Sequence, residues 1–182
     1  MQIKTTSFEG LIEIFPDVFV DERGWFYEFY KEETFAKNNL HYSFVQENQS
    51  FSKKGVVRGL HFQHPPYAQA KLVTALTGKV LDVVVDLRPT SPTFKQTYSC
   101  VLESSKRNML LVPEGFAHGF AALEDSIFFY KCSNVYDKQS ESGIRWNDPA
   151  LKIDWTVENP IISAKDSELP SLAALLENSL IS

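Results

Sequence analysis

Residues 79–88 read KVLDVVVDLR, and their alternation favours a β-strand. Successive side chains of a strand point to opposite faces, so odd and even positions separate into two sets. The segments LTG before it and RPTSPT after it are turn signals. One face of the expected strand carries Leu81, Val83, Val85 and Leu87, and the other carries Val80, Asp82, Val84 and Asp86.

The same succession of strand and turn continues along the chain. FKQTYSCVLE, NMLLVPEG, GFAALEDS and IFFYKCSNVY follow at roughly the 8–12-residue spacing that is typical of sandwiches and barrels. Helices are expected only at Glu32–Asn38 and Pro170–Asn178, where Pro170 suits a first helical turn. We therefore predict an all-β fold: one jelly-roll barrel (a double-stranded β-helix) over residues 1–182, with a few short peripheral helices.

The composition limits the classes of partner and location. A net charge of −5 argues against a nucleic acid or an anionic membrane surface as partner. No apolar stretch approaches the about 20 residues that a membrane span needs, and residues 1–10 do not read as a signal peptide. A cytoplasmic location is therefore expected. Cys100 and Cys132 are too few for a disulfide framework and are expected to be buried free thiols.

Residues 112–120, VPEGFAHGF, contain a second informative pattern. The spacing Pro113-x-Gly115-x-x-His118 resembles the second motif of the cupin superfamily, whose members are small jelly-roll barrels. Proline cannot donate to a sheet ladder and glycine permits a tight turn, so the segment is expected to form a corner that delivers His118. The resemblance makes His118 a candidate site residue in a cupin barrel.

The stretch VVRGLHFQHPP contains His61 and His64, which raises the question of a metal site. Metal-binding cupins supply H-x-H and a nearby glutamate here, but residues three apart in a strand point to opposite faces. The acid is missing, and Lys71 near its expected position would repel a cation. We expect no metal site here. A metal-dependent cupin dioxygenase or isomerase that uses His61, His64 and His118 is the competing hypothesis.

Without a metal, the basic and aromatic side chains suggest acid–base chemistry. A neutral histidine is a suitable base near pH 7, especially when a carboxylate orients its ring. Lys71 and Arg58 are suited to stabilising an oxyanion or holding phosphates. Tyr130 alternates with Phe128, so both are expected to face one cavity, where the phenol can donate a proton.

Six segments, in order along residues 8–175, resemble the dTDP-4-dehydrorhamnose 3,5-epimerase family. The resemblance implies a cofactor-free cupin homodimer whose partner is a dTDP-sugar substrate, dTDP-4-dehydro-6-deoxy-D-glucose. Inversion at C3 and C5 through a C4 enolate gives dTDP-4-dehydro-L-rhamnose, a precursor of dTDP-L-rhamnose. The segments are DERGWFYE, FVQENQSFSKKGVVRGLHFQ, AKLVTALTGKVLDVVVDLRPTSPTF, VPEGFAHGF, FYKCSNVYDKQSESGIRWNDP and PIISAKDSELPSL.

The resemblance also implies catalytic roles. His61 in RGLHFQ corresponds to the base, and Asp166 in SAKDSELP to the carboxylate paired with it, as in other His–Asp dyads. Tyr130 corresponds to the proton donor on the opposite face of the sugar. The residues implied to lie around the C4 enolate oxygen are Lys71, which stabilises it, and Arg58 and His118 beside it.

Further positions resemble substrate contacts of the family. Arg23 in DERG corresponds to an arginine that reaches the diphosphate, and Glu28 to a contact on the thymidine side. Phe26 and Tyr136 are suited to sandwiching the thymine ring. The remaining implied contacts are Gln46, Glu47, Asn48, Glu141 and Lys165.

Three positions depart from the usual family pattern. Ala70 stands where glycine is common, Trp25 where phenylalanine is common, and SNVY where an acidic or Thr-containing, Tyr-rich run is frequent. None removes a residue assigned to the chemistry, but they leave the sugar preference open. A mono-epimerase that inverts only C3 or C5 of a related dTDP-4-keto-6-deoxy sugar is therefore an alternative. A non-catalytic sugar-nucleotide binding module is another.

Arg58 and His61 are three residues apart, so a regular strand would not aim both into one cavity. We expect Gly59 to break the alternation with a bulge or a twist. In that arrangement Arg58 and His61 are site residues and His64 is a bystander.

Overall fold

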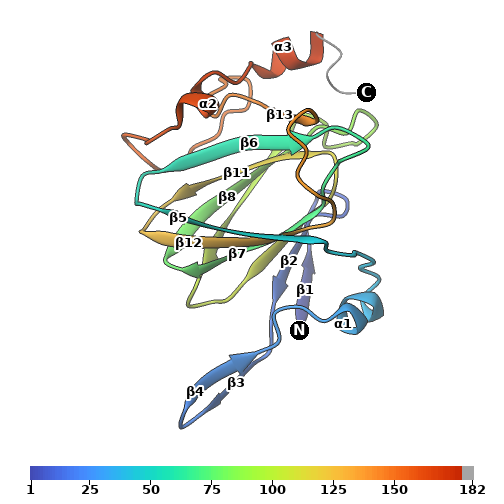
Figure 1. Cartoon of the computed structure of the whole chain (residues 1–182), viewed down its shortest axis with the longest axis vertical. Coiled ribbons are helices and arrows are strands. Elements are labelled where there is room, and N and C mark those ends of the chain that lie inside the picture. Colours follow the sequence, from blue (N-terminus) through green and yellow to red (C-terminus); the bar gives the residue numbers. More distant parts are fainter. Residues whose placement is uncertain (178–182) are drawn as a thin grey trace.

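The structure, a computed structural model, describes residues 1–177. Two antiparallel sheets face each other and form a jelly-roll barrel (Figure 1), which confirms the all-β prediction. The larger sheet contains, in order, β1 (Gln2–Thr5), β2 (Ile12–Phe15), β10 (Met109–Val112), β7 (Lys71–Thr77), β12 (Ser126–Cys132) and β5 (Gln46–Ser52). The other contains β13 (Glu141–Gly143), β6 (Val57–Gln63), β11 (Phe116–Ala122), β8 (Lys79–Asp86) and β9 (Thr97–Glu103).

Within the described residues, one hairpin and three short helices lie outside the barrel. The hairpin of β3 (Val18–Asp21) and β4 (Gly24–Tyr27) projects away from the two sheets (Figure 1). The first expected helix is present as α1 (Glu32–Lys37). The expected tail helix begins as α3 (Leu172–Glu177), and its last expected residue, Asn178, lies outside the described residues. The short α2 (Ala164–Ser167) was not expected. No helix within the described residues is long and apolar enough to cross a membrane.

Strand β8 is buried on both faces, which explains why apolar residues stand on both faces of its sequence. Val80 and Val84 pack in the interior between the two sheets. Leu81 on the other face packs under the C-terminal segment, against a cluster that includes Trp155 and Leu175. Burial of each such side chain stabilises the fold by about 1.5–3 kcal/mol. This outer apolar cluster holds the C-terminal segment, and α2 with it, against the barrel (Figure 1).

Both cysteines are free thiols, as expected. Cys132 is buried, whereas Cys100 is only partly buried.

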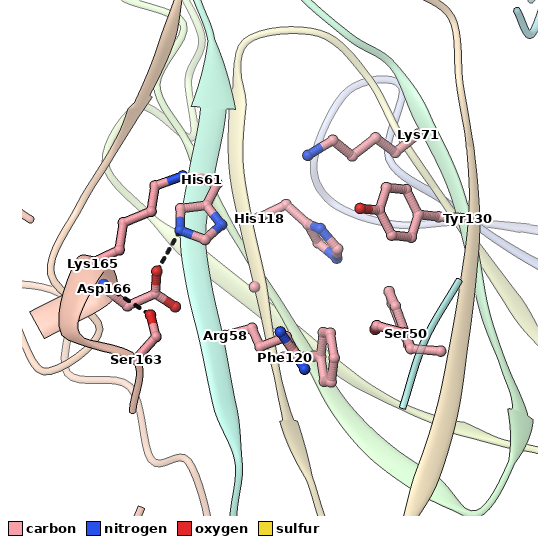
Figure 2. A pocket seen from close by; sticks show the side chains of 12 residues that line it. Ser50, Arg58, His61, Lys71, His118, Phe120, Tyr130, Ser163, Lys165 and Asp166 are labelled. Carbon is pink, nitrogen blue, oxygen red and sulfur yellow. Dashed lines mark hydrogen bonds and ion pairs between the residues drawn. The ribbon is translucent and has the colours of Figure 1, made fainter. Parts of the chain in front are cut away.

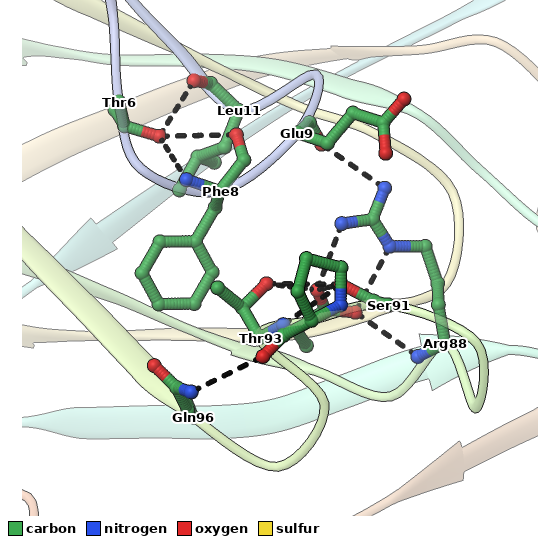
Figure 3. A network of polar contacts seen from close by, with 10 residues as sticks. Thr6, Phe8, Glu9, Leu11, Arg88, Ser91, Thr93 and Gln96 are labelled. Atoms are coloured by element: carbon green, nitrogen blue, oxygen red, sulfur yellow. Dashed lines mark hydrogen bonds and ion pairs between the residues drawn. The ribbon is translucent and has the colours of Figure 1, made fainter.

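Asp86, at the end of β8, is fully buried and accepts several hydrogen bonds. Figure 3 shows Arg88, Ser91 and Thr93 of this polar network. The Asp86 carboxylate accepts bonds of 2.9 and 2.8 Å from the Arg88 guanidinium and of 2.6 Å from each hydroxyl of Ser91 and Thr93. Arg88 also donates to the Glu9 carbonyl at 3.0 Å. Burial raises the pKa of Asp86, but these donors outweigh it and lower the pKa to about 2. The network therefore ties the β1–β2 connection to the barrel.

We predict that Asp86→Asn weakens the link between the β1–β2 connection and the barrel. The variant should also lose the part of the pH dependence of stability that Asp86 contributes. The pKa of Asp86 is lowered from 3.8 to about 2. The stabilisation is therefore present above about pH 4 and lost as the pH falls toward 2, worth roughly 2 kcal/mol. Urea unfolding of both proteins between pH 7 and pH 2 measures this. The variant should be less stable at pH 7 and lose less stability on acidification than the wild type. Equal losses of stability in the wild type and the variant would contradict the assigned role of Asp86. Glu114→Gln, which changes a carboxylate on the surface, is the control.

Candidate active site

A cavity of about 310 Å³ opens between the two sheets at the end where α2 lies. It gathers all four residues assigned to catalysis. Figure 2 shows His61 and Asp166 on one wall, Tyr130 and Lys71 on the other, and His118 between them. The residues that line it are Ser50, Arg58, His61, Lys71, His118, Gly119, Phe120, Phe128, Tyr130, Ser163, Lys165 and Asp166.

His61 and Asp166 form a close pair although they lie far apart in the chain. The Nε2 atom of His61 is 2.9 Å from Oδ1 of Asp166, and Oδ2 accepts the N–H of Gly59 at 3.1 Å. Burial raises the pKa of Asp166, but the bonds from His61 and Gly59 outweigh it and lower the pKa. The carboxylate therefore accepts the Nε2 proton. The other ring nitrogen of His61, Nδ1, points toward the middle of the cavity (Figure 2) and is available as a base.

Helix α2 is what brings Asp166 to this position. Its N-cap residue, Ser163, accepts the backbone N–H of Asp166 at 3.1 Å, which stabilises the first turn. Asp166 is 4% exposed, so its carboxylate is held where only the groups of the cavity reach it.

A bulge in β6 allows both Arg58 and His61 to face the cavity, as expected. On β11, His118 pairs with His61 and Phe120 with Arg58, so a two-residue step on one strand matches a three-residue step on the other. Gly59, between them, has φ +115°, and a Cβ there would lie 2.6 Å from the Cα of Gly119. Only glycine fits this backbone conformation and this close approach. The bulge thus sets the direction of the two side chains.

The opposite wall carries Lys71 and Tyr130 on the neighbouring strands β7 and β12. Burial lowers the pKa of the Lys71 ammonium and raises the pKa of the Tyr130 phenol. Phe128 lines the same cavity, as its alternation with Tyr130 predicts. An ammonium and a phenol therefore face the imidazole of His61 across the cavity (Figure 2).

His118 makes a second histidine–carboxylate pair, with Asp82 of β8. Its Nε2 lies 2.9 and 3.0 Å from the two oxygens of Asp82. Sequence reasoning missed Asp82 as a site residue, although an acid on the interior face of an otherwise apolar strand was a usable signal. It also missed Ser50 and Ser163 as residues that line the cavity.

A second cavity, of about 260 Å³, shares His61, Lys71 and Tyr130 with the first and holds part of the predicted nucleotide site. The carboxylate of Glu141 accepts the Tyr136 hydroxyl at 2.8 Å and the Lys165 ammonium at 2.6 Å. Burial raises the pKa of Glu141, but these two bonds outweigh it and lower the pKa. The predicted contacts that line this cavity are Gln46, Asn48, Tyr136 and Glu141.

Four of the predicted contacts are not brought to these cavities within one chain. Glu47 lies on the opposite face of β5 from Asn48 and pairs with Lys131. The other three, on the projecting hairpin and just after it, are Arg23, Phe26 and Glu28.

His64 does not join His61 and His118. Its ring packs against Phe62 at 4.9 Å between centroids, and its Nε2 is buried without a hydrogen-bond partner. Within the described residues, no group of three or more His, Cys, Asp or Glu side chains could hold a metal ion.

Comparisons with known proteins agree on one family. A family model described as dTDP-4-dehydrorhamnose 3,5-epimerase matches residues 5–174. The dTDP-4-dehydrorhamnose 3,5-epimerase of Shigella flexneri is 45% identical over 168 residues, which are 91% of this chain and 93% of that protein. The Bacillus anthracis structure with TDP and PPi bound is 43% identical, with a TM-score of 0.92 over 94% of this chain and 99% of the other. A Legionella pneumophila structure in complex with dTDP-4-keto-L-rhamnose is 40% identical, with a TM-score of 0.93 over 98% and 96%.

Proposed function

The chain belongs to the dTDP-4-dehydrorhamnose 3,5-epimerase family, and we propose that its His61–Asp166 pair and Tyr130 carry out the epimerisation from opposite walls of the cavity. The protein is an isomerase that acts on a dTDP-sugar. The reaction inverts C3 and C5 of dTDP-4-dehydro-6-deoxy-D-glucose. The C4 ketone acidifies the hydrogens on both carbons, because removal of either gives an enolate.

The observation that carries the proposal is the placement of a base and an acid on facing walls (Figure 2). Inversion requires that a proton leaves one face of the sugar and another arrives at the opposite face. Nδ1 of His61 takes the proton, while Asp166 holds the Nε2 proton and stabilises the imidazolium. Tyr130 donates from the other wall. Lys71 and Arg58 offset the negative charge on the C4 oxygen.

The nucleotide is proposed to occupy the second cavity. Tyr136 supplies an aromatic face for the thymine ring, and Gln46 and Asn48 line the same groove with amides. Lys165, whose ammonium is bonded to Glu141, lies where the two cavities meet and is suited to the diphosphate.

We also propose that the enzyme is a homodimer in which the β3–β4 hairpin of one copy completes the site of the other. The hairpin exposes large apolar side chains, with Phe26 67% and Val20 77% exposed. Arg23, Phe26 and Glu28, the predicted substrate contacts of this region, lie away from the cavity of their own chain. The hairpin projects from the barrel, as an exchanged element would (Figure 1).

A cytoplasmic location is part of the same proposal. A dTDP-sugar carries charged phosphates and does not cross a bilayer unaided, so the enzyme is placed where nucleotides are made.

The reaction itself is tested by incubating the 4-keto substrate with the enzyme in deuterated water, with a coupled reductase to trap the product. We expect NMR to show deuterium at both C3 and C5. Uptake at one carbon only would replace the double epimerase with a mono-epimerase. No uptake at either carbon would overturn the proposed function.

Asp166→Asn is expected to lower kcat by about 10²–10⁴-fold, because the amide cannot stabilise the imidazolium that forms on His61. The dissociation constant for dTDP should change little, since the phosphate contacts are untouched. Steady-state kinetics and calorimetric titration with dTDP measure the two effects. Glu168→Gln, which changes an exposed carboxylate two residues further on, is the control. A loss of dTDP binding as large as the loss of kcat would tell against the assigned role.

If the hairpin is exchanged between the two copies, two inactive variants should regain activity when they form mixed dimers. Arg23→Ala and Asp166→Asn damage the hairpin contribution and the cavity contribution respectively. Mixed dimers then hold one native site each, so unfolding and refolding an equal mixture should recover about a quarter of the native sites. Activity that stays at the level of the separate variants, or a monomer in sedimentation analysis, would rule out the exchange.

A further inference from the structure

The Asp82–His118 pair lies at the inner side of the cavity; the family resemblance places His118 near the C4 oxygen, but Asp82 has no assigned role. Asp82 is fully buried and His118 is 8% exposed. On the paired strands β8 and β11, Asp82 stands opposite Phe120, and Val84 stands opposite His118. Asp82 and His118 are therefore diagonal neighbours on the same face of the sheet, within reach of each other. Both carboxylate oxygens lie within 3.0 Å of Nε2 of His118.

The other ring nitrogen of His118, Nδ1, is free to form a hydrogen bond with the substrate. Within the described residues, Nδ1 of His118 makes no hydrogen bond, and it is not among the buried polar atoms that lack a partner. His118 lies between His61 on one wall and Tyr130 on the other (Figure 2). A sugar held between the base and the acid therefore brings its C4 region to His118.

The charges around Asp82 favour a pair with no net charge. The titratable groups that face Asp82 within the described residues are Lys71 from β7, Cys100 from β9 and His118 from β11. Burial raises the pKa of Asp82, against the attraction of His118 and Lys71. Burial also lowers the pKa of Lys71 and raises the pKa of the Cys100 thiol. Burial therefore disfavours the charged forms of Asp82, Lys71 and Cys100.

A neutral Asp82–His118 pair holds two protons, and their positions follow from the geometry. One proton lies between the carboxylate and Nε2, and the other is on Nδ1. This remains true whether the shared proton is closer to the oxygen or to the nitrogen. Nδ1 is then a hydrogen-bond donor, whereas a neutral histidine with its proton on Nε2 would turn a lone pair toward the cavity.

We propose that Asp82 is a positioning residue that keeps a proton on Nδ1 of His118, so that His118 donates a hydrogen bond to the C4 oxygen of the substrate. This inference rests on the proposed function. As His61 removes a proton from C3 or C5, the electron pair of the C–H bond moves onto the C4 oxygen. The shared proton shifts toward Nε2 and places positive charge on the ring beside the enolate. When carbon is reprotonated the shift reverses, so the pair consumes no proton.

The protonation state is measured on the enzyme without substrate, by NMR of protein labelled with ¹⁵N-histidine. The chain has four histidines, and His118→Asn assigns the signals of His118. We expect Nδ1 of His118 to carry a bonded proton at neutral pH. A bare Nδ1 would mean that Asp82 is an anion balanced by the Lys71 ammonium, and would overturn the proposal.

The catalytic consequence is measured with Asp82→Asn and the deuterium exchange experiment. The C4 oxygen serves both centres, so exchange at C3 and at C5 should slow by the same factor, about 10- to 100-fold. The dissociation constant for dTDP should stay within about threefold of the wild-type value, because the nucleotide contacts are remote from Asp82. Exchange rates within twofold of wild type, or unequal losses at the two carbons, would overturn the proposal.

Asp86→Asn is the matched control, because Asp86 is a fully buried carboxylate of the same strand that does not line the cavity. A general loss of stability would slow deuterium exchange in both variants. A role at the C4 oxygen would slow exchange only in Asp82→Asn. If Asp82→Asn does not fold, the NMR measurement on the wild type decides alone. If the wild-type enzyme shows no exchange at either carbon, the proposed function fails, and the NMR result still reports the state of His118.

Discussion

The close contact between the backbones of Gly59 and Gly119 is the constraint on which the candidate active-site cavity depends. A Cβ on Gly59 would lie 2.6 Å from the Cα of Gly119, and one on Gly119 would lie 2.5 Å from the carbonyl oxygen of Arg58. The bulge that this contact permits turns Arg58 and His61 into the same cavity. It also presents the N–H of Gly59 to Asp166, which orients the carboxylate toward His61. Two glycines therefore determine the position of His61, the proposed base.

Each carboxylate of the site is held in place by a specific hydrogen-bond donor. Asp166 is bonded to His61, Asp82 to His118 and Glu141 to Lys165. A buried charge without a partner is costly, so each pair holds its members in place as well as setting their proton affinity. Asp166 and Glu141 have lowered pKa values and remain anionic, whereas the pKa of the more deeply buried Asp82 is raised. The carboxylates of the two histidine–carboxylate pairs thus have pKa values shifted in opposite directions, although both accept from a histidine Nε2 at about 2.9 Å.

Much of the fold and the centre of the site could be predicted from the sequence. The alternation of residues 79–88 and the turn signals around them are local, and β8 follows them. The bulge at Gly59 was predictable because Arg58 and His61 were assigned to one cavity at a spacing that a regular strand forbids. Helix α2 was not predicted, since four residues are too few for a periodic pattern. Its only local signal was Ser163, three residues before Asp166.

The sequence by itself determined the strands, the turns and the types of acid and base side chain available to a site, because these depend on local alternation and on composition. Only the tertiary structure decided which of those groups meet. The pairing of Asp82 with His118 depends on the register between β8 and β11. The outward direction of Glu47 depends on its place opposite Lys131. The position of Arg23 and Phe26 depends on the projecting hairpin (Figure 1). Each is a relation between segments distant in the chain, which no local pattern encodes.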